Sequence, residues 1–578
     1  MLHRLLKTNF GLCLLAVLPL WAQTGYNNHA QLSVRLKALS TKYNATASVR
    51  SVGKSSGGRD LWLLTLSKGD ASKKPAVLIV AGIEGSHLAG TELAVQMAEK
   101  MLASNNDTIA KLLDTKTFYF LPSVNPDAQE QFFSKLKYER SGNDTKTDDD
   151  RDGRIDEDPF EDLNGDGLIT LIRVEDPTGS YVASKEDPRV MVKADGSKGE
   201  TGKYLLLTEG SDNDQDGQYN EDGVGGIIPD KNFTFDYQIF TTGGGEYAAE
   251  AVEVRALLDF LYKSPNIFAV LTFGPHNNLS EAPKFEKEKA SKKIISGPLQ
   301  KDINAMQQVS KLYNAATGLK DAPKMPQTRG NFAQTAYYHA GRFSFTTPGW
   351  WVPKIAPAKD TTQKDSTRPK ADEVPKAEGE TGRAAGMGAA AGADATPKPG
   401  EEEIRFLKWA DKEKIPNAFV AWTAIKHPDF PDQKVEVGGI TPFAKLNPPV
   451  SYLEPIADKH LTFLKGLGQQ MPQIQLVKLK TENLGAGLNR ISVTVVNKGL
   501  LPTYTEIGDK VRFVQKVKTE LKLANGQAIV SGKRLNLHPT LGADESEEYS
   551  WLISGTGKLT IEASCPTAGN SSLEVTLK

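Results

Sequence analysis

The chain has very little cysteine and no excess of basic residues. Cys13 lies in an N-terminal stretch that we expect to be removed, so Cys565 has no partner for an intramolecular disulfide. The 70 lysines and arginines are balanced by 71 aspartates and glutamates. Nucleic-acid-binding proteins carry a basic surplus, so we expect no nucleic-acid partner.

Long apolar runs are also absent after the N-terminus, and none reaches the roughly 18 residues of a membrane helix. The stretch 1–22 predicts a signal peptide, because His3 and Arg4 precede the apolar run 10–20 and the small residue Ala22. A buried N-terminal helix is the alternative. With the signal removed we expect no membrane span. An exported chain without disulfides is typical of a bacterial envelope, so we expect a periplasmic or secreted protein.

Strand and helix patterns alternate in the first half of the chain. Residues 75–81 (PAVLIVA) predict a strand buried on both faces, 93–102 a helix and 117–121 a second strand. This order predicts an α/β fold with a mixed, mostly parallel twisted sheet and flanking helices. Ligands bind at the carboxyl ends of such strands, so chemistry is expected in the loops after Ala81, Leu121 and Phe273.

The composition divides the rest of the chain. We expect an α/β domain at 23–470 with an acidic Asp/Gly-rich insert at 144–223. A second insert at 355–403 has almost no large apolar side chains and is expected to be disordered. From 471 to 578 short alternating runs predict a β-sandwich module, with Asn525-Gly526 forming a tight hairpin turn.

Several short motifs follow one another in a specific order. They are 53–59 (GKSSGGR), 82–90 (GIEGSHLAG), 125–127 (NPD), 230–233 (DKNF) and His276 after a strand at 268–273. This series resembles the carboxypeptidase A-like zinc peptidases, and the resemblance covers about residues 30–470. It implies the fold of that family and metal-assisted hydrolysis of a peptide bond.

The resemblance implies a zinc site at Glu84, His87 and His276. The family pattern is His-x-x-Glu with a distant His, and here the first two ligands are exchanged. One carboxylate and two imidazoles remain, which is a set that catalytic zinc uses. The alternative is that Glu84 and His87 only hydrogen-bond to each other.

Two other positions depart from the family pattern. Thr347 or Pro348 stands where the family has its catalytic Glu, and neither side chain shuttles a proton at neutral pH. Asp230 and Lys231 replace the Asn-Arg pair that holds the substrate carboxylate. Lys231 keeps the positive charge as a point contact, whereas Asp230 would repel a carboxylate.

The acidic insert repeats one pattern three times. Oxygen ligands at alternate positions followed by a turn glycine suit calcium. The candidate ligands are Asp148, Asp150 and Asp152, then Asp162, Asn164 and Asp166, then Asp212, Asp214 and Asp216. The alternative is a solvated acidic loop.

Two functions follow from these patterns. The first is an exported zinc metallocarboxypeptidase-like protein that acts on peptides or cell-wall peptides with an altered metal site. The second is an inactive protein of the same fold that binds peptide or glycan. The partner of the C-terminal module is not identified by the sequence.

Overall fold

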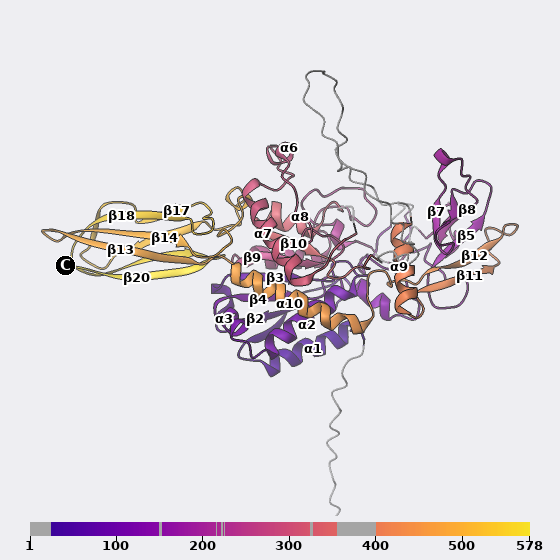
Figure 1. Cartoon of the computed structure of the whole chain (residues 1–578), viewed down its shortest axis with the longest axis horizontal. Coiled ribbons are helices and arrows are strands. Elements are labelled where there is room, and N and C mark those ends of the chain that lie inside the picture. The colour runs from indigo at the N-terminus through magenta and orange to yellow at the C-terminus, as the bar shows by residue number, and fades with distance from the viewer. Residues whose placement is uncertain are drawn as a thin grey trace, which may run out of the picture.

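The structure is a computed structural model that describes residues 25–148, 153–215, 217–220, 223–224, 226–323, 328–354 and 400–578. The expected signal peptide at 1–22 and most of the insert at 355–403 lie outside the described residues. The molecule is elongated, with the C-terminal β-strands at one end, the α/β body in the middle and a second sheet at the other end (Figure 1).

A six-stranded mixed sheet forms the centre of the α/β body and confirms the expected fold class. Its strand order is β1 (Ala47–Lys54), β2 (Asp60–Leu66), β4 (Thr117–Leu121), β3 (Ala76–Val80), β9 (Ile267–Phe273) and β10 (Phe343–Thr347). β1, β2 and β4 pair antiparallel, whereas β4, β3, β9 and β10 pair parallel. The parallel strands therefore end at the same edge.

Helices cover both faces of this sheet because its strands alternate their apolar side chains between two cores. One face packs against α1 (His29–Lys42), α2 (Leu88–Ala103), α3 (Asp107–Thr115), α7 (Gln300–Thr317) and α10 (Leu453–Gln470). The other face packs against α5 (Val252–Lys263) and α8 (Phe332–Tyr338). β3 is buried along its whole length, as its continuous apolar run predicts.

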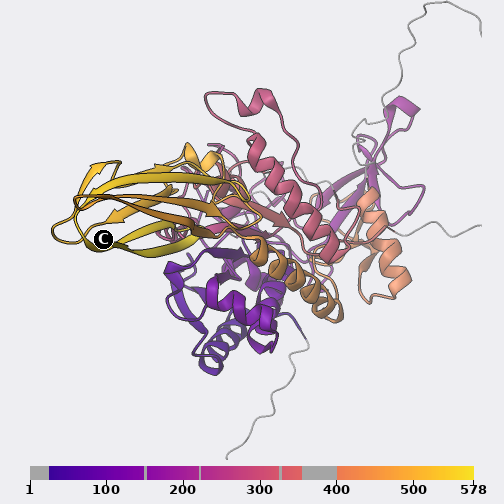
Figure 2. The same cartoon turned by 60° about the vertical axis from the view of Figure 1, so that its left-hand side comes forward.

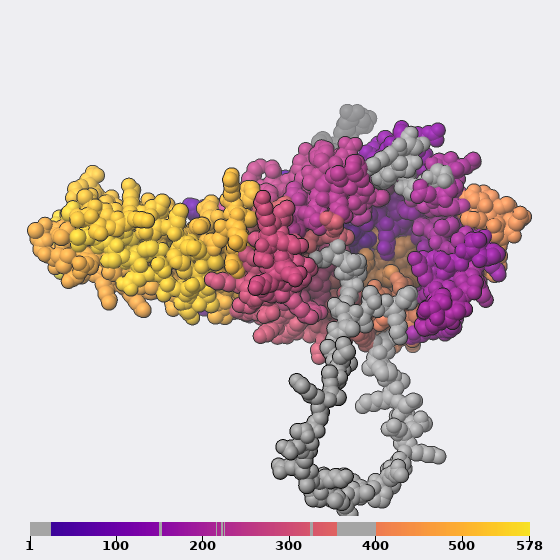
Figure 3. All heavy atoms as spheres, turned by 90° about the horizontal axis from the view of Figure 1, so that it is seen from above, coloured from indigo at the N-terminus to yellow at the C-terminus, as the bar shows by residue number. Residues whose placement is uncertain are grey.

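The acidic insert contributes to a second sheet that the sequence patterns did not reveal. Its order is β11 (Phe419–Ile425), β12 (Val435–Ile440), β5 (Leu171–Glu175), β8 (Tyr204–Thr208), β6 (Tyr181–Ala183) and β7 (Met191–Lys193). Helix α9 (Glu401–Glu413) lies beside it (Figure 1). The surface is hollowed between this sheet and the α/β body (Figure 3).

The C-terminal strands form two antiparallel four-stranded sheets around one apolar core, which confirms the expected β-sandwich. One sheet is β13 (Ile474–Gly485), β14 (Leu488–Asn497), β18 (Ser546–Ser554) and β16 (Ala528–Ser531). The other is β17 (Leu535–His538), β15 (Val517–Lys522), β19 (Gly557–Cys565) and β20 (Gly569–Leu577).

The prediction of a tight hairpin at Asn525-Gly526 is wrong. The turn exists, with Gly526 at a φ of 83°, but it joins β15 to β16, which lie in different sheets. Local turn chemistry fixes the reversal of the chain, whereas packing of the two sheets decides which strand each run pairs with.

The remaining elements are short. They are α4 (Pro126–Gln129), α6 (Lys287–Ala290), η1 (Ala71–Lys73), η2 (Glu130–Phe133), η3 (Gly196–Lys198), η4 (Pro229–Lys231), η5 (Val450–Tyr452) and η6 (Ile507–Asp509).

The β-sandwich packs directly on the α/β body (Figure 2). The rings of Tyr262 and Phe513 lie 4.2 Å apart, and Thr505 donates a hydrogen bond to the carbonyl of Gly341. Asp302 of α7 accepts hydrogen bonds from the backbone N–H groups of Glu506 and Ile507. The two parts are therefore joined by buried polar and apolar contacts.

Candidate functional site

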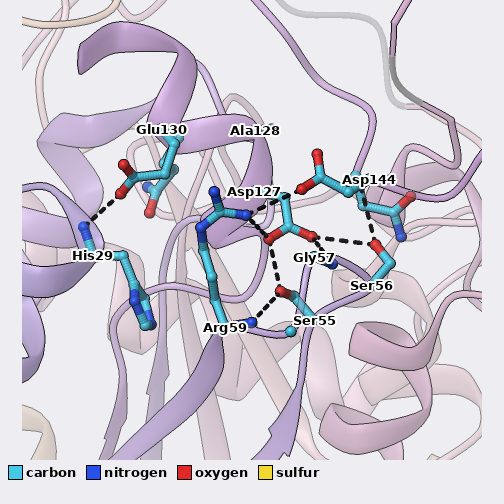
Figure 4. A network of polar contacts seen from close by, with 12 residues as sticks. His29, Ser55, Ser56, Gly57, Arg59, Asp127, Ala128, Glu130 and Asp144 are labelled. Atoms are coloured by element: carbon cyan, nitrogen blue, oxygen red, sulfur yellow. Dashed lines mark hydrogen bonds and ion pairs between the residues drawn. The ribbon is translucent and has the colours of Figure 1, made fainter. Parts of the chain in front are cut away.

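A polar network supports the loops around the sheet edge (Figure 4). The buried carboxylate of Asp127 accepts hydrogen bonds from the Ser55 hydroxyl at 2.7 Å and the Gly57 N–H at 2.8 Å. The Arg59 guanidinium donates to the same carboxylate at 2.6 Å and reaches Asp144 at 3.1 Å. These bonds hold the pKa of Asp127 below its usual value despite burial. The GKSSGGR and NPD motifs thus meet in space and fix two loops together.

Glu84 lies in the loop between β3 and α2, at the carboxyl edge of the parallel strands. Its carboxylate accepts hydrogen bonds from the Ser141 hydroxyl at 2.7 Å and the Ser86 hydroxyl at 3.1 Å. Burial raises the pKa of this carboxyl, and the negative charge of Asp230 raises it further. Two hydroxyls therefore hold the buried carboxyl of Glu84 in place.

His87 caps the start of α2 and is buried, with 2% of its surface exposed. Its Nε2 donates to the Pro348 carbonyl at 3.0 Å, which leaves Nδ1 as the unprotonated nitrogen without a hydrogen-bond partner. Burial lowers the pKa of His87 to about 4. A Cβ added at Gly90 would lie 2.9 Å from Nδ1, so the ring packs tightly against the helix start.

His276 lies beyond β9 and faces Asp230 across the cavity. Its Nε2 lies 2.9 Å from the Thr328 hydroxyl and 3.4 Å from Oδ2 of Asp230, and its Nδ1 is buried without a partner. The other oxygen of Asp230 accepts a hydrogen bond from the N–H of Phe332 at 3.0 Å. A carboxylate therefore stands beside His276, and it comes from η4 rather than from β10.

Two adjoining cavities separate the expected zinc ligands. Glu84, Asp230 and His276 line a small cavity of about 10 Å³, which has room for about one water molecule. Glu84 and His87 line a larger one of about 250 Å³. Within the described residues, no group of three or more His, Cys, Asp or Glu side chains is arranged to hold a metal ion. The arrangement of Glu84, His87 and His276 therefore does not fit a zinc ion bound by all three.

The two residues at the family's Glu position lie apart from the small cavity. The hydroxyl of Thr347 is buried and shares a hydrogen bond of 2.7 Å with the hydroxyl of Tyr313. It also accepts a hydrogen bond from the backbone N–H of Gly349. Pro348 lines the larger cavity, and its carbonyl accepts a hydrogen bond from Nε2 of His87. Neither residue supplies an acidic group to either cavity.

Lys231 points to a backbone carbonyl rather than to a cavity. Its Nζ donates to the Thr242 carbonyl at 3.0 Å in an exposed position. Its neighbour Asp230 lines the small cavity. The structure therefore brings Asp230 but not Lys231 to the site expected from the sequence.

The larger cavity contains a charged residue that the sequence patterns did not single out. Arg405 of α9 lines it together with Trp350 and Trp351. The only signal in the sequence was an arginine on an amphipathic helix that follows the low-complexity insert, which is too common a pattern to indicate a site. Glu139 and Lys445 line this cavity and also a neighbouring one of about 370 Å³, whose walls include part of the acidic insert.

The three acidic repeats share one local contact. The N–H of the turn glycine donates to the first aspartate in each repeat, from Gly153 to Asp148 at 3.0 Å, from Gly167 to Asp162 at 2.8 Å and from Gly217 to Asp212 at 3.0 Å. Asp162 also accepts hydrogen bonds from the backbone N–H groups of Gly165 and Asp166. Asn164 bonds within the same loop, and Asp214 lies in the third loop. Asp150, Asp152 and Asp216 lie outside the described residues.

Two family models match the chain. Residues 33–166 match the one described as Zinc carboxypeptidase, a segment that contains β1 to β4, Glu84, His87 and Asp127. Residues 473–576 match the one described as Domain of unknown function (DUF8731) and cover the β-sandwich. The resemblance to zinc carboxypeptidases is therefore confirmed for the first segment, and the name of that family implies zinc.

Curated relatives match a similar segment. The chain is 34% identical over 110 residues to carboxypeptidase D of Drosophila melanogaster, covering 18% of this chain and 8% of that protein. It is 32% identical over 111 residues to carboxypeptidase B of Astacus astacus, covering 19% and 36%. A zinc carboxypeptidase of Saccharothrix mutabilis subsp. capreolus is 32% identical over 111 residues, covering 18% and 26%. The matches thus span less than two thirds of the length of these relatives.

Solved structures are similar at low identity. Thrombin activatable fibrinolysis inhibitor aligns with a TM-score of 0.34 and 14% identity, covering 56% of this chain and 66% of that one. Carboxypeptidase A of Helicoverpa armigera aligns with a TM-score of 0.33 and 15% identity, covering 56% and 64%. Among the described residues, no helix has both the length and the apolar character needed to cross a membrane.

Proposed function

We propose that the α/β domain is a zinc carboxypeptidase-like protein that binds peptides or cell-wall peptides without hydrolysing them. Its binding cleft is the pair of adjoining cavities lined by Glu84, His87 and His276. The observation that carries this proposal is the placement of His87, whose ring is buried against the Pro348 carbonyl rather than beside His276. The absence of an acidic residue at the family's Glu position, which Thr347 or Pro348 occupies, supports it further.

The proposal is tested by incubating the purified chain with a peptide library, with and without added zinc, and measuring both hydrolysis and binding. We expect binding, no hydrolysis and no tightly held zinc in metal analysis. Hydrolysis that requires zinc and disappears in His276→Ala would overturn it. A matched His538→Ala variant, altered in the β-sandwich far from the cleft, controls for nonspecific effects of losing a histidine.

Metal-assisted hydrolysis of a peptide bond is the second candidate. It is favoured by the match to the zinc carboxypeptidase family and by one observation: Glu84, Asp230 and His276 line the same small cavity. Zinc bound by a family member supplies a Lewis acid and an activated water. Zinc-dependent hydrolysis lost in both Asp230→Asn and His276→Ala would establish this candidate in place of the first.

We further propose that the acidic insert binds calcium through its three loops. Support comes from the shared bond between the first aspartate and the turn glycine, which orients the loop oxygens. Calcium is expected to raise the melting temperature and to protect the insert from proteolysis. Asp162→Ala should weaken this effect, whereas Asp176→Ala, in an ordinary turn of the same insert, should not. An unchanged melting temperature in calcium contradicts the proposal.

Export is proposed from the signal peptide pattern at 1–22. N-terminal sequencing of the protein recovered outside the cytoplasm is expected to begin near Gln23, and recovery of the uncleaved chain in the cytoplasm would contradict export. We also propose that the β-sandwich docks to a partner rather than catalyses, because such modules are usually built for packing. The module alone, used as bait against envelope material, tests this.

A further inference from the structure

The two faces of the second sheet have different surroundings, because side chains alternate between the faces of a strand. One face packs on a small apolar core formed by Ile172, Val174, Val435 and Val437. The other face contributes Leu171, Leu206 and Trp422 to a cavity of about 370 Å³. Tyr138 and Phe160, from the segment that leads out of the α/β body, line the same cavity. The second sheet therefore builds a cavity of its own beside the cleft.

The walls of this second-sheet cavity are apolar, aromatic and fixed in place. The rings of Tyr138 and Phe160 lie 4.9 Å apart. Trp422 donates a hydrogen bond from Nε1 to the Arg189 carbonyl at 3.1 Å, and the Arg173 guanidinium lies 4.4 Å from its ring centre. These side chains are half-buried, so part of their apolar surface stays open to the cavity. Its volume lies within the range of small-molecule sites.

The two cations that line the second-sheet cavity both have carboxylate partners. Lys445 pairs with Glu403 at 2.8 Å. Arg189 pairs with Asp187 at 2.7 Å and with Asp411 at 2.6 Å. An anionic ligand would therefore have to break an existing ion pair to find a cation here.

Glu139 is the lining carboxylate that has no cation partner. It accepts a hydrogen bond from the backbone N–H of Phe443 at 2.7 Å and forms no ion pair with any of the described residues. Its side chain is exposed, and it lines both the second-sheet cavity and the larger cavity of the cleft. An unbalanced negative charge next to aromatic rings favours a positively charged ligand, since the faces of such rings also attract cations.

We propose that the second-sheet cavity binds a small organic cation, a protonated amine with an aromatic or branched apolar body. The apolar body contacts Leu206 and Trp422, and the ammonium group faces Glu139. This site goes beyond the proposed function, because its walls come from the second sheet and not from the cavities that Glu84, His87 and His276 line.

The test uses the full chain in EDTA at neutral pH and two probes, tryptamine and its uncharged N-acetyl derivative, with binding measured by calorimetry. Tryptamine should bind about threefold to fivefold more tightly, a modest factor because the carboxylate is exposed. Added salt should weaken the binding of tryptamine alone. Glu139→Gln should make the two affinities equal. Glu402→Gln is the matched control, because Glu402 lines the larger cavity but not the second-sheet cavity.

A second variant locates the binding site. Leu206→Trp fills the second-sheet cavity and should abolish the binding of both probes. Leu537→Trp is its control, because Leu537 is 61% exposed on the β-sandwich. The unfolding temperature of each variant is measured, and Thr208→Phe, which fills the same cavity from the same strand, replaces Leu206→Trp if that variant is unfolded.

Four results would overturn the inference: no binding of either probe, equal affinities in the wild type, a Glu139→Gln variant that keeps the preference, or binding that survives filling of the cavity. A preference lost in Glu402→Gln would place the amine in the cleft and would also overturn it. None of these results bears on peptide binding or hydrolysis in the cleft, which the peptide library measures separately.

Discussion

The stability of the contact between the α/β body and the β-sandwich should depend on the protonation of Asp302. This side chain is fully buried and accepts hydrogen bonds from the N–H of Glu506 at 2.5 Å, the N–H of Ile507 at 3.1 Å and the Tyr337 hydroxyl at 2.6 Å. Burial nevertheless raises the pKa of Asp302 from 3.8 to about 6, because desolvation of the charge outweighs these bonds.

The sign follows from the number of bound protons. Between pH 4 and 6 the folded protein holds a proton on Asp302 that the unfolded chain has lost, so the free energy of unfolding falls as the pH rises through this range. A shift of about 2 pKa units corresponds to about 3 kcal/mol, which is fully lost above pH 6. Asp302→Asn removes the charge and hence this slope, while any cost of its altered hydrogen bonds is independent of pH.

The assay compares denaturant unfolding of the wild type and Asp302→Asn at pH 4.5, 6 and 7.5, with far-UV and tryptophan signals recorded together. Between pH 4.5 and pH 7.5 the variant should gain on the wild type by about 2 kcal/mol, since part of the effect is already lost at pH 4.5. Asp259→Asn is the control, because Asp259 is exposed and pairs with Lys263 on the same helix. Parallel stability curves for the wild type and Asp302→Asn would refute the reasoning.

Three further predictions concern the loops of the cleft. Asp127→Asn removes the buried charge opposite Arg59 and should lower the free energy of unfolding by about 3 kcal/mol in thermal unfolding. Asp144→Asn, in the same network but partly exposed, should lower it by less than about 1 kcal/mol. Equal losses in the two variants would contradict the difference in burial. The pKa of His87 is lowered to about 4 by burial, so the folded chain binds fewer protons than the unfolded chain between pH 4 and 6.5, and stability should fall as the pH falls through that window. NMR of the His87 ring should show the neutral form at pH 5, and a midpoint near 6.5 would contradict its burial. Gly90→Ala should destabilise by about 1–3 kcal/mol in thermal unfolding, because the new methyl group would lie within 3 Å of both Phe273 and the His87 ring; an unchanged melting temperature would show that the ring has room to move.

The central sheet could be predicted because its strands carry their own signal. The expected strand at 117–121 has the bounds of β4, and the continuous apolar run at 75–81 contains β3. Both are buried on two faces, so hydrophobic composition alone identifies them. The motif order also located the loops at the carboxyl edge, because parallel strands must end together.

The second sheet could not be predicted in the same way. Residues such as Val435 and Val174 pair across more than 250 positions of the chain, and the strands of the insert are short and half exposed. The Asp- and Gly-rich loops between them dominate the composition, so the segment is typical of a loop. Pairing of this kind depends on what the rest of the fold places next to each strand.

The sequence by itself determined the types of side chain at the cleft and the exchange of Glu84 and His87. Only the tertiary structure decided that His87 faces the Pro348 carbonyl, that Asp230 stands beside His276, and that Arg405 enters the neighbouring cavity. The physical reason is that a motif fixes a residue's position along the chain, whereas the direction of its side chain and its partners depend on packing between segments far apart in sequence.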